Sequence, residues 1–373
     1  MDIRNLNTQI KHNIFWVFEL SKYIGSFPYD ILSLKLNKSF TTWSILVHLS
    51  AILLMTSGYL SYTSFTNSKI EVYSILMTKL LLISFGVKCA TFLYFKFKVV
   101  SRLKEILLEL NQIHAYFEQL SCLDIVPDRV ARKQGLTIAA FFLTHLFAFS
   151  FRMTMLTKFR NDLTFALYII NFLTFSTVLQ CTNLLDLVKH YLNIINIELI
   201  NISNNQDKQH FIHLYKSRIC VLNNMLPENY LCRRKLKVLL LLHFCLCKLS
   251  DRLVNRLFAV HIGITMFNEC LQLTTNLYFL VVLFVQSKSL MAVWTYIFYI
   301  SLWVVYNLLM LLWIIKHCVD TKEALTEFLD RVCSHKLHFT VFEFFDIDYS
   351  VLRNLLGAVL SFGIIVIQLS VTS

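Results

Sequence analysis

The chain has 373 residues, of which 56% are hydrophobic and only 16% are charged. Soluble domains carry about 25% charged residues, so this composition excludes an ordinary soluble protein and points to a membrane protein. The formal net charge of +12 reflects mostly the Lys and Arg residues that set the orientation of a membrane protein. Binding to nucleic acid is not needed to explain it.

Seven segments are apolar and long enough to cross about 30 Å of hydrocarbon, which takes roughly 20 residues. A shorter amphipathic stretch precedes them, from Ile14 to Leu34. It predicts an interfacial helix that is ended by Phe27 and Pro28 and does not cross the membrane. The seven predicted spans lie near residues 40–62, 73–95, 135–156, 164–186, 257–285, 292–315 and 351–371.

Lys and Arg are concentrated in alternate connections between these spans. With the long loop 187–256 left aside, one set of connections holds 17 of them and the other set holds four. By the positive-inside rule, the N-terminus is predicted to be cytoplasmic and the C-terminus extracellular.

The predicted cytoplasmic side is rich in helical patterns. Residues 99–120 repeat apolar side chains at helical spacing, 189–202 extend the fourth span inward, and 211–225 form a helix before Pro227. Residues 234–257 run into the fifth span without a breaker. These segments predict a compact helical bundle, either within one chain or between chains.

Charged and imidazole side chains inside the second and third spans have ordinary explanations. Lys79 and Arg152 lie near outer helix ends and Lys88 near an inner end, which favours snorkelling to the headgroups. His145, in the middle of its span, is interpreted as a satisfied core histidine rather than a sensor.

The fifth span carries a polar stripe, and three neighbouring spans supply aromatic and amide residues. Two readings of the stripe are open: the wall of a ligand pocket or polar contacts between helices. The aromatic stripe of the sixth span is typical of helix packing or of an interfacial belt. If this stripe faces the polar stripe of the fifth span, its rings would instead stack on a ligand. The polar stripe is Thr265, Glu269, Gln272 and Asn276, the aromatic stripe is Tyr296, Tyr299, Trp303 and Tyr306, and the fourth span adds Tyr168, Asn171 and Phe172.

The seventh span places an amide on an apolar face. At helical spacing Ser361, Ile364, Ile365 and Gln368 share that face with Thr372. The face is a candidate pore lining, in which Gln368 contacts a dehydrating cation and the apolar residues narrow the path. The alternative is that Gln368 bonds a neighbouring helix or lies at the outer interface.

Chemistry-bearing motifs are absent from the sequence. It contains no Gly-rich phosphate loop, no His-Glu-x-x-His helix and no nucleophile elbow. The ten cysteines lack metal-ligand spacing and are interpreted as reduced thiols. We therefore expect neither an enzyme nor a metal or cofactor site.

Both ends of the chain resemble the insect gustatory receptors, relatives of the insect odorant receptors. The family's last helix has the pattern Thr-Tyr, five apolar residues, Gln-Phe, which is similar to Ser361-Phe362, five residues, Gln368-Leu369. The stretch 344–352 resembles the family's Phe-Phe-x-Leu-Asp-Tyr-Ser-Leu-Leu segment, and 21–28 its Gly-x-x-Pro segment. Phe362 lacks the phenol hydroxyl, Leu369 replaces Phe, and Glu343 stands where a small residue is common, so the chain resembles a divergent member.

This resemblance implies an all-α, seven-transmembrane helical bundle with cytoplasmic helical extensions that form an anchor. It implies a ligand-gated non-selective cation channel that detects a tastant and depolarises a gustatory receptor neuron from its plasma membrane. Partners would be membrane lipid and the tastant, in a homotetramer or a tetramer with other gustatory receptor subunits. The expected division is a membrane bundle, 1–316, and an anchor helix with the pore-lining span, 317–373.

The resemblance assigns roles to two sets of residues. A G-protein-coupled-type receptor and a multispan transporter remain as alternatives, although the first requires an extracellular N-terminus and the second broken helices at mid-membrane. The expected pore and gate residues are Ser361, Phe362, Ile364, Ile365, Gln368 and Leu369. The expected ligand-binding residues are Tyr168, Asn171, Phe172, Glu269, Gln272, Asn276, Tyr299 and Trp303.

Overall fold

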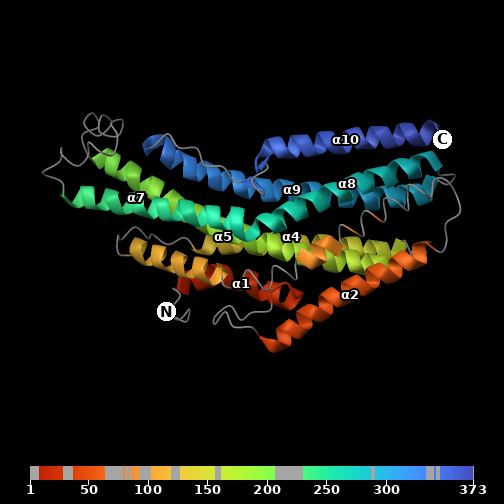
Figure 1. The fold of residues 1–373 in the computed structure, drawn as a ribbon, viewed down its shortest axis with the longest axis horizontal. Helices are drawn as coiled ribbons and strands as arrows, with labels where there is room; N and C mark the ends of the chain where they lie inside the picture. Colours follow the sequence, from red (N-terminus) through yellow and green to blue (C-terminus); the bar gives the residue numbers. More distant parts are fainter. Residues whose placement is uncertain are drawn as a thin grey trace.

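Long helices that run side by side form almost all of the structure, a computed structural model (Figure 1). It describes residues 8–27, 37–63, 79, 83, 86–91, 102–118, 127–155, 161–205, 230–286, 290–332, 340–341 and 345–372. Within these ranges the strands are the two-residue β1 (Thr340–Val341) and β2 (Phe345–Asp346), which pair antiparallel.

The helical elements follow the apolar segments of the sequence closely. Residues 102–118 are also helical, and α7, η3 and α8 form one uninterrupted helical run in which η3 is a π-helical stretch. The elements are α1 (Thr8–Ile24), α2 (Lys38–Thr63), α4 (Pro127–Met155), α5 (Asn161–Asn205), α7 (Tyr230–Asp251), η3 (Arg252–Phe258), α8 (Ala259–Gln286), α9 (Leu290–Val332) and α10 (Tyr349–Thr372).

Six of the predicted spans coincide with α2, α4, α5, α8, α9 and α10. By length and apolarity alone, Tyr168–Ile200 and Ile297–Thr326 are each sufficient to cross a membrane. The predicted second span lies mostly outside the described residues, of which 79, 83 and 86–91 are helical. The predicted helix at 211–225 lies wholly outside them.

The first helix ends earlier than predicted. It stops at Ile24, and Gly25 adopts a φ of 88°, the left-handed conformation that glycine tolerates and other residues disfavour. The Ser26 amide then donates to the Ser21 carbonyl at 2.9 Å. A Cβ at position 25 would also lie 3.3 Å from Cγ2 of Val47 in α2. The glycine, rather than the Phe27-Pro28 pair, therefore terminates the helix.

The fourth span forms the centre of the fold. The helix α5 packs against α1, α2, α7 and α9, and it is buried along most of its length. Its N-terminal half meets α1 through buried hydroxyl groups, with Ser176 Oγ 2.7 Å from Ser21 Oγ and 2.5 Å from Ser26 Oγ. The long α5 therefore positions the side chains that converge on it from the surrounding helices.

One end of the bundle, which we call the charged end, is joined by ion pairs between helices. It comprises residues 102–118, α7 with η3, and the C-terminal parts of α5 and α9. Lys189 of α5 lies 2.8 Å from Asp320 of α9, and Lys235 of α7 lies 2.6 Å from Glu198 of α5. Arg252 pairs with Glu109. This end is the region that the sequence predicts as a compact cytoplasmic bundle.

Candidate functional site

The last helix, α10, packs on α8 and α9 and leaves its other side uncovered within one chain. Ile364 is 55% exposed, Ile365 is 52% exposed, and Ser361 and Gln368 are also exposed. Figure 1 shows α10 along the edge of the bundle. The side chains of Phe362 and Leu369 lie outside those described. The face predicted to line a pore is thus available to lipid, water or another subunit.

An aspartate begins this helix. The Oδ1 atom of Asp348 accepts hydrogen bonds from the amides of Ser350 at 2.8 Å and Val351 at 3.3 Å, as an N-cap residue does. A further hydrogen bond from the Ser350 hydroxyl lowers the pKa of the Asp348 carboxyl, because it stabilises the ionised form. The Asp-Tyr-Ser sequence at 348–350 therefore fixes where α10 starts.

A buried ion pair connects the second predicted span to α8. Lys88 Nζ donates to Glu269 Oε1 at 3.3 Å, and each side chain is 1% exposed. The prediction that Lys88 snorkels to the headgroups is wrong, because its ammonium group is held inside the bundle by the carboxylate. Lys79 is exposed, in keeping with snorkelling, and the Arg152 side chain is not among those described.

Helix geometry places two amides at the depth of this ion pair. Glu269 lies 17 residues before the end of α8 at Gln286, and Asn307 lies 17 residues after the start of the antiparallel α9 at Leu290. The helices α5 and α9 run parallel, and the rings of Tyr168 and Trp303 meet at 5.5 Å. This register brings Asn171, three residues further along α5, level with Asn307. We call Lys88, Asn171, Glu269 and Asn307 the polar layer.

Several buried polar atoms in and beside the polar layer have no hydrogen-bond partner among the described residues. They are Glu269 Oε2, Asn171 Oδ1 and both side-chain polar atoms of Asn307, together with Gln272 Nε2 and Thr265 Oγ1 on α8. All of these side chains are 0–6% exposed. Buried polar atoms are nearly always hydrogen-bonded, so within the described part of the chain these atoms lack the partners that such atoms normally have. Gln180 Nε2, further along α5, shares this feature.

Aromatic rings pack beside the polar layer. His145 of α4 lies between the fourth and sixth spans, with its ring 4.9 Å from Tyr306 and 5.9 Å from Trp303. Its Nδ1 lies 3.1 Å from the Phe141 carbonyl oxygen, and its Nε2 has no hydrogen-bond partner among the described residues. His145 is thus a buried core histidine that is satisfied at one ring nitrogen. Trp303 and Tyr306 of α9 thus pack on α4 and α5, and Tyr306 is also within electrostatic range of Glu269.

The other predicted ligand-binding residues surround the same region to different degrees. Tyr168 and Tyr299 are buried, and Phe172, Asn276 and Trp303 are half-buried. The Tyr299 ring lies 6.3 Å from that of Trp303. The side chain of Tyr296 is not described. The sequence analysis did not assign Lys88 or Asn307 to the ligand site. For Lys88 a signal was available, because Lys88 and Glu269 are opposite charges that both lie inside apolar spans.

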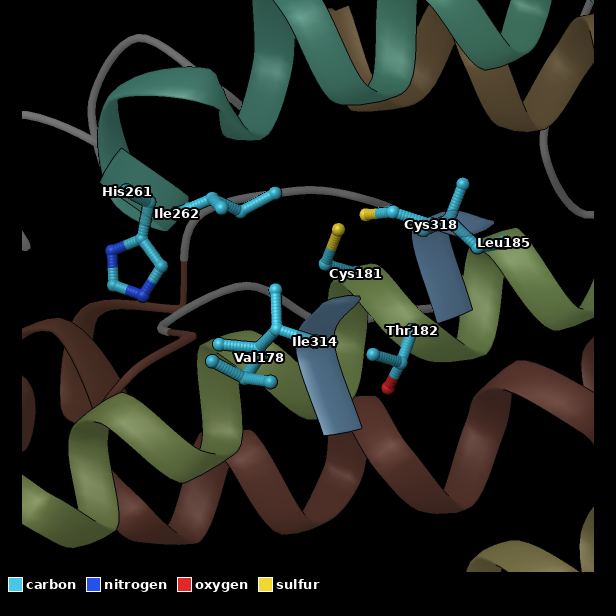
Figure 2. A pocket seen from close by; sticks show the side chains of 8 residues that line it. All are labelled: Val178, Cys181, Thr182, Leu185, His261, Ile262, Ile314 and Cys318. Atoms are coloured by element: carbon cyan, nitrogen blue, oxygen red, sulfur yellow. The ribbon is translucent and has the colours of Figure 1, made fainter. Parts of the chain in front are cut away.

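A small pocket lies between the polar layer and the charged end (Figure 2). Its volume is about 10 Å³, roughly what a single water molecule requires. Figure 2 shows His261 at one side and the sulfur atoms of Cys181 and Cys318 pointing toward one another near the middle. His261 is within electrostatic range of Lys88. The space is lined by Val178, Cys181, Thr182, Leu185, His261, Ile262, Ile314 and Cys318.

Comparison with solved structures shows the same fold in an insect receptor. The insect olfactory receptor OR5 from Machilis hrabei, solved in complex with eugenol, matches with a TM-score of 0.57 and 12% sequence identity. The match covers 97% of this chain and 100% of that chain. At this identity the likeness establishes the fold alone.

Comparison of the sequence with known families gives a match over nearly its whole length. A search of curated proteins returned no significant match. The family model described as 7tm Chemosensory receptor matches residues 15–373, which confirms the resemblance found at the two ends of the chain. The chain therefore belongs to the seven-transmembrane chemosensory receptor family.

Proposed function

We propose that this receptor is a gustatory receptor that acts as a ligand-gated, non-selective cation channel. Four copies, identical or mixed with other gustatory receptor subunits, would surround a central pore lined by α10 in the plasma membrane of a gustatory receptor neuron. A tastant that binds among the spans would open the pore and depolarise the cell. The N-terminus and the charged end would face the cytoplasm, where the charged end forms the anchor.

The uncovered face of α10 is the observation that carries this proposal. It combines two half-exposed isoleucines, Ile364 and Ile365, with the amide of Gln368. An amide that faces lipid is costly, whereas one that faces water or protein is not. Arranged around an axis, the isoleucines would form a constriction that closes by dewetting, and the amide oxygens would contact a passing cation.

The packing of α8 provides a route from ligand to pore. This helix carries Glu269 and Gln272, and it also forms the main contact of α10. A ligand shifts the equilibrium between closed and open states only through different contacts with each. Rearrangement of α8 around a bound tastant would meet this condition and move α10. The residues proposed to contact the tastant are Tyr168, Asn171, Phe172, Glu269, Gln272, Asn276, Tyr299 and Trp303.

Recording from excised membrane patches tests the proposal. Cells that express the receptor are exposed to a tastant panel, and currents are measured without nucleotide on the cytoplasmic face. We expect tastant-evoked cation currents whose permeability ratios change in Gln368→Ala and whose gating changes in Ile364→Ala. Leu309→Ala, at a 59% exposed position on α9, is the matched control and should leave both properties unchanged.

Three results would contradict the channel. Currents that require GTP would support the G-protein-coupled alternative, as would an N-terminal tag that is accessible on intact cells. Permeation that is identical in the wild type and in every variant from Ser361 to Thr372 would remove α10 from the pore.

A further inference from the structure

The polar layer offers hydrogen-bonding groups that the described part of the chain does not use. Glu269 Oε2 and the Asn171 and Asn307 Oδ1 atoms can accept, and Gln272 Nε2 and Asn307 Nδ2 can donate. Helix packing leaves all of these atoms with almost no exposure. Because burying such groups without partners is unfavourable, their partner is expected to come from outside the chain.

The charge of the layer restricts what that partner can be. Lys88 and Glu269 are the charged side chains that the structure describes at this depth, and their charges cancel at a separation of 3.3 Å. A ligand with a net charge would enter a low-dielectric interior without a counter-ion, which is strongly unfavourable. An uncharged ligand avoids this cost and still satisfies the unused donors and acceptors.

The surroundings of the layer indicate the shape of the ligand. Trp303 and Tyr306 of α9, with Tyr168 of α5, place aromatic surface beside the polar atoms. Their ring contacts at 5.5 Å form a wall that is apolar on its faces. A molecule with an apolar or flat body and a hydroxyl group complements both parts of the site.

We infer that the polar layer binds an uncharged hydroxyl compound, whose O–H donates to Glu269 Oε2 and whose oxygen accepts from Asn307 Nδ2. Lys88 is a positioning residue in this arrangement: it holds the other carboxylate oxygen and balances its charge. The inference rests on the proposed ligand-gated function and adds to it the chemical class of the ligand and the participation of Lys88 and Asn307.

Binding to the purified full-length receptor tests the inference without reference to currents. The probes are alcohols, amines and carboxylates that share carbon skeletons, beginning with benzyl alcohol, benzylamine and benzoate. The readout is the concentration dependence of thermal stabilisation. For the wild type we expect stabilisation by alcohols and none by the charged analogues. Alcohols that give no stabilisation, or charged analogues that bind equally well, would overturn the inference.

Substitutions at the ion pair provide a readout that a purely structural role would not change. Glu269→Gln removes the charged acceptor, so alcohol affinity should fall about 10- to 100-fold, the range for a hydrogen bond to a charged group. Lys88→Met leaves the carboxylate uncompensated and should shift selectivity from alcohols to amines. If one of these folds poorly, the charge-neutral double variant Lys88→Met/Glu269→Gln should fold and show the same weakened alcohol binding.

A second ion pair between helices serves as the control. Lys189→Met and Asp320→Asn break a 2.8 Å pair at the charged end and should leave ligand selectivity unchanged. Unaltered alcohol affinity in Glu269→Gln would overturn the inference and indicate that ordered water alone occupies the layer. Alcohol binding without any evoked current would contradict the channel proposal and leave the binding site intact.

Discussion

Removing one partner of the Lys88–Glu269 pair should destabilise the receptor far more than removing both. At 3.3 Å and an effective dielectric constant of about 20, the attraction is about 5 kcal/mol. Both side chains are 1% exposed, so Glu269→Leu leaves a buried ammonium group that water does not reach. Loss of one partner from a buried pair typically costs about 3–5 kcal/mol. We therefore expect this loss for Glu269→Leu and a similar one for Lys88→Met.

The double variant Lys88→Met/Glu269→Leu should recover most of that loss, since apolar replacements for a buried pair are often neutral. The assay is the fraction of detergent-solubilised receptor that remains folded after heating, compared across the wild type, both single variants and the double variant. Single variants as stable as the wild type would refute the burial of the pair. A double variant that loses the sum of the two single effects would refute the coupling between the residues.

Three smaller perturbations probe local features of the fold. Asp348→Ala removes the N-cap of α10 and should cost about 1 kcal/mol, seen as a lower melting temperature, while Asp348→Asn should be nearly neutral. Gly25→Ala forces an alanine into the left-handed region, where the backbone costs about 1–2 kcal/mol, and presses on Val47, so it should also lower the melting temperature. Burial lowers the pKa of His243 in α7 to about 4, so below its ordinary pKa of about 6.5 only the unfolded chain gains a proton. Stability should then fall by about 2 kcal/mol between pH 7 and pH 5, and His243→Gln should show a smaller fall in melting temperature.

Much of the architecture could be predicted because it depends on local sequence. Apolar length located the spans that the structure describes, and the helical pattern of residues 189–202 predicted the continuation of α5, which ends at Asn205. Family membership confirms the all-α, seven-transmembrane fold and a receptor rather than an enzyme. The division between 1–316 and 317–373 stays a prediction, and α9 is continuous across that boundary. The end of α1 was misplaced because the φ of Gly25 decides it, and proline is only the more visible signal.

The candidate site was only partly predictable because its contacts are not local. Lys88 and Glu269 are 181 residues apart, so the position of the lysine near a helix end assigned it to the headgroups. Asn307 follows Tyr299 and Trp303 at helical spacing on the sixth span, but it was not assigned to the site until the register of α8 and α9 placed it at the depth of Glu269. By contrast, Gln272 was proposed because helical spacing put it on the polar stripe of the fifth span, and Asn171 because it lies between Tyr168 and Phe172 on the fourth span.

The position of α10 within the assembled receptor tests the central claim most directly. Electron cryomicroscopy of the full-length receptor in lipid nanodiscs would locate this helix relative to the symmetry axis. We predict four copies with α10 around a water-filled axis, Gln368 facing it, and Ile364 or Ile365 at its narrowest point. An assembly in which α10 faces lipid at the periphery, or a single copy with no axial opening, would contradict the account.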